Sequence, residues 1–215
     1  MSEIRILNTH THSVQYLIEK DKRLAKVIDM VGEFSYKPYD DSYSFLISQI
    51  IGQMLSAKVS DILYARLQNL CSNNITPKSI SELSDEQIKS IGISNSKVKF
   101  IRELTISVVE GKLDFEKIKL MDDESAIKYL TNIYGIGKWS AKMYLIFALD
   151  RQDILPYEDV AFLQAYKWLY KVNIASPEMV MKKCKKWKPF SSIATRYMYR
   201  ALDMGYTKEK FSLNK

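Results

Sequence analysis

The stretch LTNIYGIGKWSAKMYLIFAL, residues 130–149, carries the strongest local pattern in this sequence. We expect one helix to end near Asn132 and a second to start at Lys138. The turn between them holds Gly135 and Gly137, and glycine reaches positive φ angles at little cost. The stretch therefore predicts a hairpin of two helices, which extends over about 122–149.

A turn that opens a helix presents unpaired backbone N–H groups at the positive end of the helix dipole, which suits one phosphate. Ser140 adds a hydroxyl group to the first turn, and Lys138 and Lys142 add positive charge. A side chain at either glycine would obstruct the close approach of a phosphodiester. Taken alone, the same residues also describe an ordinary turn between helices with a glycine C-cap, so the hairpin needs support from the rest of the chain.

Helical periodicity dominates the remaining sequence. Helices are expected at 97–109, 122–131, 138–149, 157–170, 176–186 and 190–203, and an apolar stripe at helical spacing runs through 47–63. A short strand is expected at Ile4–Leu7. The 215 residues include 7 glycines and 5 prolines, which disfavours a glycine-looped α/β sheet and favours long helices with few breaks.

Composition excludes several classes of site. The two histidines, His10 and His12, lie near the N-terminus, so a catalytic triad in the body of the fold is not available. Cys71 and Cys184 are far apart in sequence, which argues against a zinc site, an iron–sulfur cluster and a disulfide framework. With no apolar signal segment and no run long enough to span a bilayer, we expect a cytoplasmic, bacterial or nucleoid-associated protein without a membrane partner. The net charge of +7 suits a polyanionic partner.

Several motifs in order resemble one family. They are DKRLAKVIDMVG (21–32), FLISQIIGQMLSAKVSDILYARL (45–67), ISNSKVKFIRELTISVVEGKLDF (93–115), GIGKWSA (135–141), LPYEDVAF (155–162) and KKWKPFSSIATRYMYRAL (185–202). Together they resemble the helix-hairpin-helix DNA glycosylases, HhH-GPD superfamily, and within them the DNA-3-methyladenine glycosylase II branch. The resemblance covers roughly residues 21–203 and corresponds to the minimal form without an N-terminal β domain.

The resemblance implies an all-α fold of two lobes with the active-site cleft between them. One lobe is expected over 45–153 and ends in the hairpin, and the other combines 1–44 with 154–215. It also implies a monomer that acts on double-stranded DNA containing damaged bases.

Asp159 falls where the family places its catalytic carboxylate. Taken alone, an Asp after Pro156 near a helix start is most often a cap, and Glu158 is the neighbour that could be confused with it. An ionised carboxylate would stabilise the oxocarbenium character that develops on deoxyribose when an N-glycosidic bond breaks. Alkylation makes the base a better leaving group, so a site without histidine suffices.

The position two residues after Gly137 holds Trp139. Family members that cleave the strand through a Schiff base carry a lysine there. The resemblance therefore implies a monofunctional glycosylase that uses water, with no lyase step.

The base pocket is expected to contain an aromatic wall, since a cationic base favours electron-rich rings. Trp139 matches a pocket tryptophan of this branch, and Tyr199 stands where another tryptophan is common. Met143 and Val160 replace aromatic residues of some members, which leaves the breadth of accepted bases open. Tyr36 and Tyr39 are further candidates to close this site, while core packing is the default role of any single aromatic residue.

Gln53 and Met54 correspond to the family's intercalating pair, which fills the gap left by a flipped base. Periodicity disagrees, because Met54 falls on the apolar stripe of 47–63. The two interpretations agree if the helix breaks at Gly52 and restarts with Ser56 as N-cap. An unbroken helix through 50–60 would remove the wedge.

Two further expectations concern ions and charge. The family implies a bound Na⁺ or K⁺ at the hairpin, held by the carbonyls of Ile133, Tyr134 and Ile136, and no other cofactor. The run 181–188 contains five lysines, Lys182, Lys183, Lys185, Lys186 and Lys188. Such a run is either a solvated helix face or a contact to the DNA backbone.

The sequence thus predicts excision of alkylated, 3-methyladenine-like purines from duplex DNA in base excision repair. Two alternatives remain: a glycosylase of this superfamily for uracil, mismatched thymine or oxidised purines, or a non-catalytic DNA-binding module that keeps the hairpin.

Overall fold

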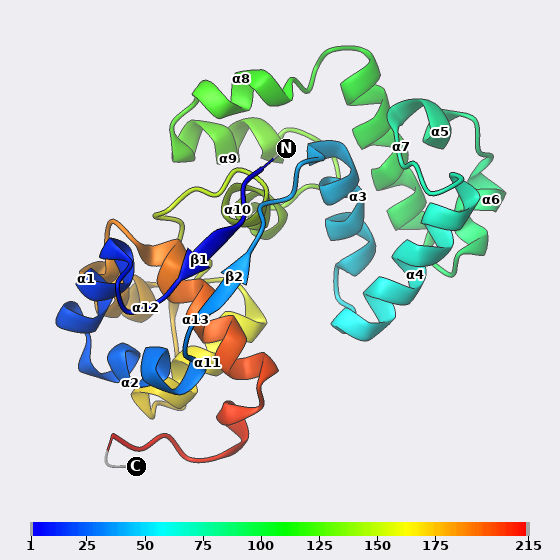
Figure 1. The fold of residues 1–215 in the computed structure, drawn as a ribbon. Coiled ribbons are helices and arrows are strands. Elements are labelled where there is room, and N and C mark those ends of the chain that lie inside the picture. The colour runs from blue at the N-terminus through cyan, green and yellow to red at the C-terminus, as the bar shows by residue number, and fades with distance from the viewer. Residues whose placement is uncertain (1, 214–215) are drawn as a thin grey trace. The chain divides into compact units, whose positions relative to one another are not determined.

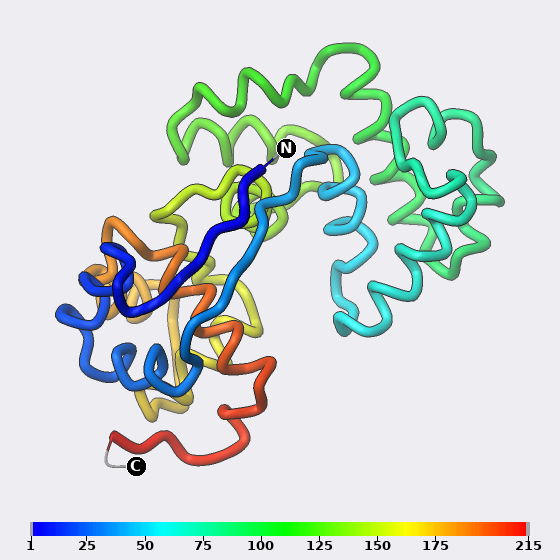
Figure 2. The backbone as a smooth tube through the Cα atoms, viewed as in Figure 1, coloured from blue at the N-terminus to red at the C-terminus, as the bar shows by residue number. Residues whose placement is uncertain are grey.

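The computed structural model describes residues 2–213 (Figure 1). The chain divides into two compact units: unit 1 contains the segments up to Pro38 and from Asp150 onward, and unit 2 is Tyr39–Leu149. The sequence analysis expects the lobe that corresponds to unit 2 to span residues 45–153. Along the tube of Figure 2, the blue start and the yellow-to-red end of the chain belong to unit 1, and the cyan and green stretch between them belongs to unit 2.

Unit 1 is helical apart from one two-stranded sheet. Its elements are β1 (Arg5–Leu7), α1 (His12–Lys20), α2 (Lys22–Val31), β2 (Phe34–Tyr36), α11 (Val160–Tyr170), α12 (Pro177–Cys184), the 3-10 turn η1 (Lys185–Trp187), α13 (Ser191–Asp203) and the 3-10 turn η2 (Tyr206–Lys208). The strands pair antiparallel, with Arg5 opposite Tyr36 and Leu7 opposite Phe34. The strand expected at Ile4–Leu7 is confirmed one residue shorter.

Unit 2 contains helices alone within its described residues. They are α3 (Ser42–Gly52), α4 (Ala57–Leu70), α5 (Pro77–Ser81), α6 (Asp85–Ser90), α7 (Asn95–Val109), α8 (Phe115–Leu120), α9 (Asp123–Thr131) and α10 (Lys138–Phe147). The expected all-α fold is therefore confirmed. No helix in residues 2–213 combines the length and apolarity that crossing a bilayer requires.

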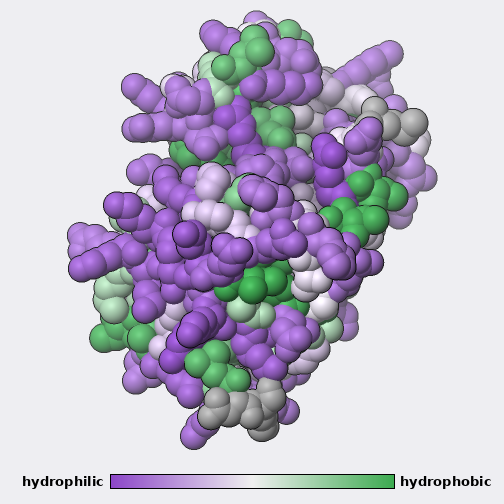
Figure 3. All heavy atoms as spheres, turned by 60° about the vertical axis from the view of Figure 1, so that its left-hand side comes forward, coloured by the Kyte–Doolittle hydropathy of each residue, from purple (hydrophilic) through white to green (hydrophobic). Residues whose placement is uncertain are grey.

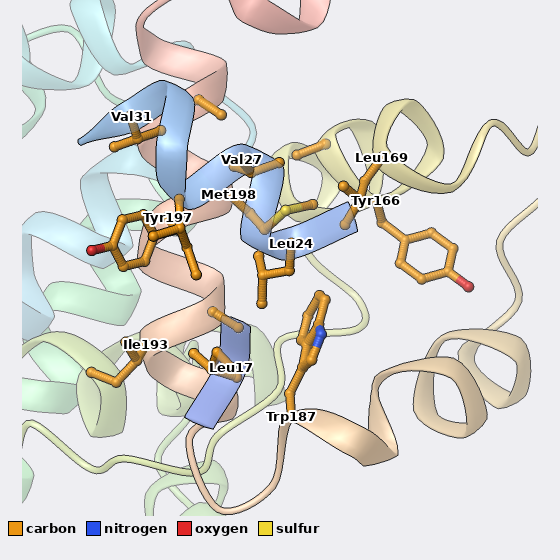
Figure 4. Close-up of a cluster of buried hydrophobic side chains, with 14 of the residues drawn as sticks. Leu17, Leu24, Val27, Val31, Tyr166, Leu169, Trp187, Ile193, Tyr197 and Met198 are labelled. Carbon is orange, nitrogen blue, oxygen red and sulfur yellow. The ribbon is translucent and has the colours of Figure 1, made fainter. Parts of the chain in front are cut away.

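The core of unit 1 joins residues from both ends of the chain. Leu17, Leu24, Trp187 and Met198 are fully buried and converge in Figure 4. They come from α1, α2, η1 and α13, so helices of the first 38 residues pack against helices of the last 66. Unit 1 exists only when both segments are present.

The core of unit 2 is centred on α3, which packs against α4, α7 and α10. Ile47, Ile50 and Ile51 of α3 are completely buried. In α10 every residue from Ser140 to Ile146 is buried, as expected for a helix that is covered on all sides. The second helix of the hairpin is thus fixed by the core of its unit.

Apolar side chains are a minority on the face of the molecule drawn in Figure 3. The face shown in Figure 3 is mostly hydrophilic, and its apolar residues form small separate groups. Such scattered exposure is ordinary for a folded domain.

Asp21 connects distant parts of unit 1. It caps α2 and is 2% exposed. Its carboxylate accepts hydrogen bonds from Trp187 Nε1 at 3.0 Å and from the hydroxyl group of Tyr170, and pairs with Lys186 Nζ at 2.9 Å. Burial by itself raises the pKa of Asp21, but the hydrogen bonds from Tyr170, Lys186 and Trp187 outweigh it and leave the pKa lowered.

Asp21→Asn is expected to lower the free energy of unfolding by about 2 kcal/mol at pH 7, because charge-assisted hydrogen bonds are lost. A lowered pKa in the folded state stabilises the fold above the unfolded value of 3.8, and this contribution disappears as the pH falls through the folded value. The difference between wild type and variant should therefore narrow below about pH 4 in urea titrations. Asp29→Asn, an exposed control on α2, should change stability by less than about 0.5 kcal/mol. If the free energies of unfolding of wild type and Asp21→Asn differed by the same amount at every pH, the ionised carboxylate of Asp21 would not be the source of the stabilisation.

Candidate functional site

The hairpin of α9 and α10 forms as expected. Helix α9 ends at Thr131, and Gly137 is the N-cap of α10. The two glycines of the turn differ, however. Gly135 has φ +94°, and a Cβ there would lie 2.3 Å from Cγ of Phe100. Gly137 is extended at φ −88° with open space around it, so the expectation of positive φ holds for Gly135 alone.

The start of α10 has no side chain that caps it, so no side chain of the cap residue blocks its first backbone N–H groups. Lys138 is exposed beside them. Ser140 and Lys142 are 2% and 6% exposed. Among the residues expected to contact DNA, Gly137 and Lys138 are the exposed ones, and the contact expected for Ser140 and Lys142 stays a prediction.

The break between α3 and α4 is confirmed. Helix α3 ends at Gly52, and α4 begins after Ser56, which occupies the N-cap position without a side-chain cap bond. Met54 lies in this break, fully exposed, with φ +59°. Met54 therefore falls on the apolar stripe by its spacing, but its side chain lies outside the core. An exposed position is what an intercalating wedge requires.

Gln53, the other residue of the expected intercalating pair, contacts the hairpin. Its Nε2 donates a hydrogen bond of 2.9 Å to the carbonyl oxygen of Gly135 and a weaker one of 3.4 Å to Oγ of Ser140. The side chain is partly buried. The amide thus connects the α3–α4 turn to the glycine turn within unit 2.

Asp159 is the N-cap of α11, as a carboxylate at a helix start should be. Its Oδ1 accepts hydrogen bonds from the backbone N–H of Phe162 at 2.6 Å and from the hydroxyl group of Tyr199 at 3.0 Å. The residue is 9% exposed, whereas Val160 beside it is 80% exposed. Because α11 starts after its cap, it is three residues shorter than the expected helix 157–170. Glu158 precedes the cap and takes no part in it.

Tyr199 on α13 is a hydrogen-bond donor to Asp159. Burial and the negative charge of Asp159 raise the pKa of Tyr199 well above its ordinary value, so the hydroxyl stays protonated and continues to donate. The sequence suggested a stacking ring at this position. The pairing between residues 40 positions apart has no signature in the sequence itself.

For the base release that the resemblance implies, Tyr199→Phe is expected to lower kcat about 10-fold, because the carboxylate loses one charge-assisted hydrogen bond. KM should change little, because the hydroxyl group of Tyr199 binds the carboxylate of Asp159 and is not expected to bind DNA. Single-turnover kinetics with damaged duplex checks this, with Tyr206→Phe as a control that removes a hydroxyl group bonded to the carbonyl of Met30. An unchanged rate would mean that the hydroxyl group of Tyr199 does not orient Asp159 for the reaction.

Of the other expected pocket residues, Trp139 and Met143 lie in unit 2, whereas Val160 is the first residue of α11 in unit 1, and its role in the pocket stays a prediction. Trp139 is half-buried in the first turn of α10, and Met143 is 4% exposed one turn later. Met143 is therefore buried. A role for either side chain in the pocket stays a prediction, as does the closing role of Tyr36 and Tyr39.

The lysine run lines a groove of about 750 Å³ in unit 1. Its walls are Tyr166, Tyr170, Val172, Met179, Lys182, Lys183, Lys185 and Lys186. Lys186 is paired with buried Asp21, and Lys183 Nζ lies 5.0 Å from the centre of the Tyr170 ring. The lysines are therefore partly engaged by their own unit, and contact to DNA stays a prediction.

Comparison with known proteins identifies these features. The family model of the HhH-GPD superfamily base excision DNA repair proteins matches residues 47–190 of this chain. These residues contain the α3–α4 turn, the hairpin turn and Asp159. The chain belongs to this superfamily.

Relatives of the HhH-GPD chain include the DNA-3-methyladenine glycosylase 1 of Schizosaccharomyces pombe, 26% identical over 94% of this chain and 92% of that protein. The crystal structure of a DNA-3-methyladenine glycosidase from Bacillus halodurans is 30% identical, with a TM-score of 0.83 and coverage of 97% of both chains. A Schizosaccharomyces pombe 3-methyladenine DNA glycosylase in complex with abasic DNA shares the fold at a TM-score of 0.83 and 23% identity, over 91% of this chain and 98% of that one. The similarity extends over nearly the whole chain.

Proposed function

We propose that this HhH-GPD protein is a monofunctional DNA glycosylase of base excision repair, which hydrolyses the N-glycosidic bond of alkylated, 3-methyladenine-like purines in duplex DNA. The observation that carries the proposal is Asp159, a carboxylate fixed at the start of α11 by two donors on one oxygen. The relatives named as 3-methyladenine glycosylases support the choice of substrate.

The chemistry follows from the charge of the carboxylate. As the bond between sugar and base stretches, positive charge develops on the deoxyribose, and a nearby anion in a site of low dielectric lowers the energy of that state. The purine leaves as a neutral base because alkylation had made it cationic. Water then adds to the sugar carbon, and its proton passes to solvent or to Asp159.

DNA is held by the turn of the hairpin. The free N–H groups at the start of α10 and the charge of Lys138 accommodate one backbone phosphate, and Gly137 leaves room for its approach. Met54 fills the gap left by the extruded nucleotide. These contacts do not depend on base sequence.

The proposal includes a Na⁺ or K⁺ bound at the hairpin. The carbonyl groups of Ile133, Tyr134 and Ile136 are hard oxygen donors, and that of Ile133 uses one lone pair for the N–H of Ile136 at 3.0 Å. The described residues contain no cluster of three acidic, histidine or cysteine side chains that could hold a metal instead. A Na⁺ or K⁺ at these carbonyls would add positive charge beneath the phosphate.

The test is a panel of duplexes that each carry one defined lesion. Release of methylated purines supports the proposal. Release of uracil, mismatched thymine or an oxidised purine alone would assign another lesion, and binding without release would favour a non-catalytic module. Borohydride should trap no efficient covalent adduct on abasic DNA, because Trp139 occupies the position of the lyase lysine.

A further inference from the structure

The turn between α3 and α4, residues 53–56, is strained and open. Met54 adopts φ +59°, a left-handed conformation that costs a non-glycine residue about 1 kcal/mol. Its side chain is fully exposed, and Leu55 is 39% exposed. Neither residue packs firmly enough to fix the turn, so its conformation depends on other contacts.

Lys97 supplies contacts on one side. This residue of α7 donates from Nζ to the carbonyl oxygen of Ile51 at 2.7 Å and to that of Gln53 at 2.8 Å. The first of these carbonyls belongs to the last turn of α3, and the second lies immediately before Met54. One ammonium group therefore joins the end of the helix to the start of the turn.

The position of Lys97 is unfavourable for its own helix. It lies in the first turn of α7, where the helix dipole repels a cation. The side chain extends instead to the C-terminal end of α3, where the dipole attracts a cation and the last carbonyls lack helical partners. The ammonium makes its two hydrogen bonds to main-chain oxygens and no salt bridge within residues 2–213.

Gln53 supplies the contact on the other side through its hydrogen bond to the carbonyl of Gly135. Gly135 has a φ of +94° and packs against the Phe100 ring so closely that no side chain would fit at this position. The turn that carries Met54 is thus joined to α7 by Lys97 and to the phosphate-binding turn by Gln53.

We propose that Lys97 is a positioning residue for Met54: it holds the α3–α4 turn in the strained conformation that lets the methionine enter the base stack while the hairpin holds the phosphate. The proposal rests on the proposed function. It predicts that Lys97 acts through Met54 and not by contacting DNA.

A double-mutant cycle tests this. Lys97→Met keeps the aliphatic stem and removes the ammonium group. Two signals are measured: the rate of base release, and the fluorescence of 2-aminopurine placed beside a tetrahydrofuran abasic analogue. Lys97→Met and Met54→Ala should each reduce both signals about 10-fold, and the double variant should fall no more than about 2-fold below Met54→Ala, because coupled residues are not additive. Independent effects that multiply to about 100-fold would overturn the proposal.

Lys99→Met is the matched control, since Lys99 is an exposed lysine two residues along α7. It should leave both signals near wild type. The salt dependence of DNA affinity separates the alternatives further, because removing a lysine that contacts a phosphate lowers the slope by about 1. We expect an unchanged slope for Lys97→Met, and a lowered slope would assign Lys97 to the DNA interface instead.

Two measurements keep the result interpretable. If Lys97→Met unfolds at the assay temperature, Gln53→Leu removes the second attachment of the turn and should give the same dependence on Met54. Wild-type protein that releases no base from any duplex would refute the proposed function. Normal release by wild type together with an additive cycle would refute only the role of Lys97.

Discussion

Asp159→Asn is expected to lower the rate of base release by about 100-fold or more, since preorganised electrostatic stabilisation of a transition state is worth that much. The substitution removes the charge and keeps the shape. Asn is as good an N-cap as Asp, so the hydrogen bond from Phe162 and the fold should be retained. Single-turnover base release and binding to abasic-analogue duplex, measured on the same preparation, separate chemistry from DNA affinity.

Glu158→Gln is the matched control, because it removes the same charge one residue earlier. Glu158 lies before the N-cap of α11, and the hydrogen bond from the backbone N–H of Phe162 goes to Asp159. The control should release base within about 2-fold of wild type, because the proposed reaction uses the carboxylate of Asp159 alone. Equal activity of Asp159→Asn and wild type would remove this carboxylate from the reaction.

Gly135→Ala is expected to reduce thermal stability, whereas Gly137→Ala is expected to reduce DNA affinity. At Gly135 a methyl group meets the Phe100 ring at 2.3 Å and the backbone is left-handed, so we expect a loss of about 3 kcal/mol from overpacking and strain. For a chain of this length, that corresponds to a fall of Tm by roughly 10 °C. Thermal unfolding followed by circular dichroism checks the first variant.

At Gly137 the added methyl group meets nothing within 4 Å, so Tm should stay near wild type. The methyl group projects instead where the phosphate approaches, and the loss of one charge-assisted hydrogen bond should weaken DNA binding about 10-fold. Fluorescence anisotropy with undamaged duplex measures this. Wild-type affinity of Gly137→Ala would place the phosphate elsewhere, and wild-type Tm of Gly135→Ala would show that Phe100 moves freely.

Much of the fold is predictable because its signals are local. Asp122, Ser176 and Asp159 each precede a helix and cap it, and Gly135 marks the turn of the hairpin. The apolar stripe through 47–63 was misleading by itself, since spacing cannot show that Met54 lies in a break between two helices. The motif resolved what periodicity could not.

The remaining features depend on contacts between distant residues. Tyr199 donates to Asp159 from another helix, and Lys97 reaches carbonyls 44 and 46 positions away. Backbone carbonyls exist at every residue, so no letter of the sequence marks these as acceptors. A lysine in the first turn of a helix, against the dipole, was the one available indication for Lys97.

The discontinuity of unit 1 has a consequence for synthesis on the ribosome. Unit 2 is one continuous segment, whereas Asp21 and its partner Tyr170 are separated by 149 positions. Domains generally fold as units while the nascent chain emerges. The N-terminal helices must therefore wait, unpaired, until α11 and α13 have been translated, and the part that carries Asp159 matures last.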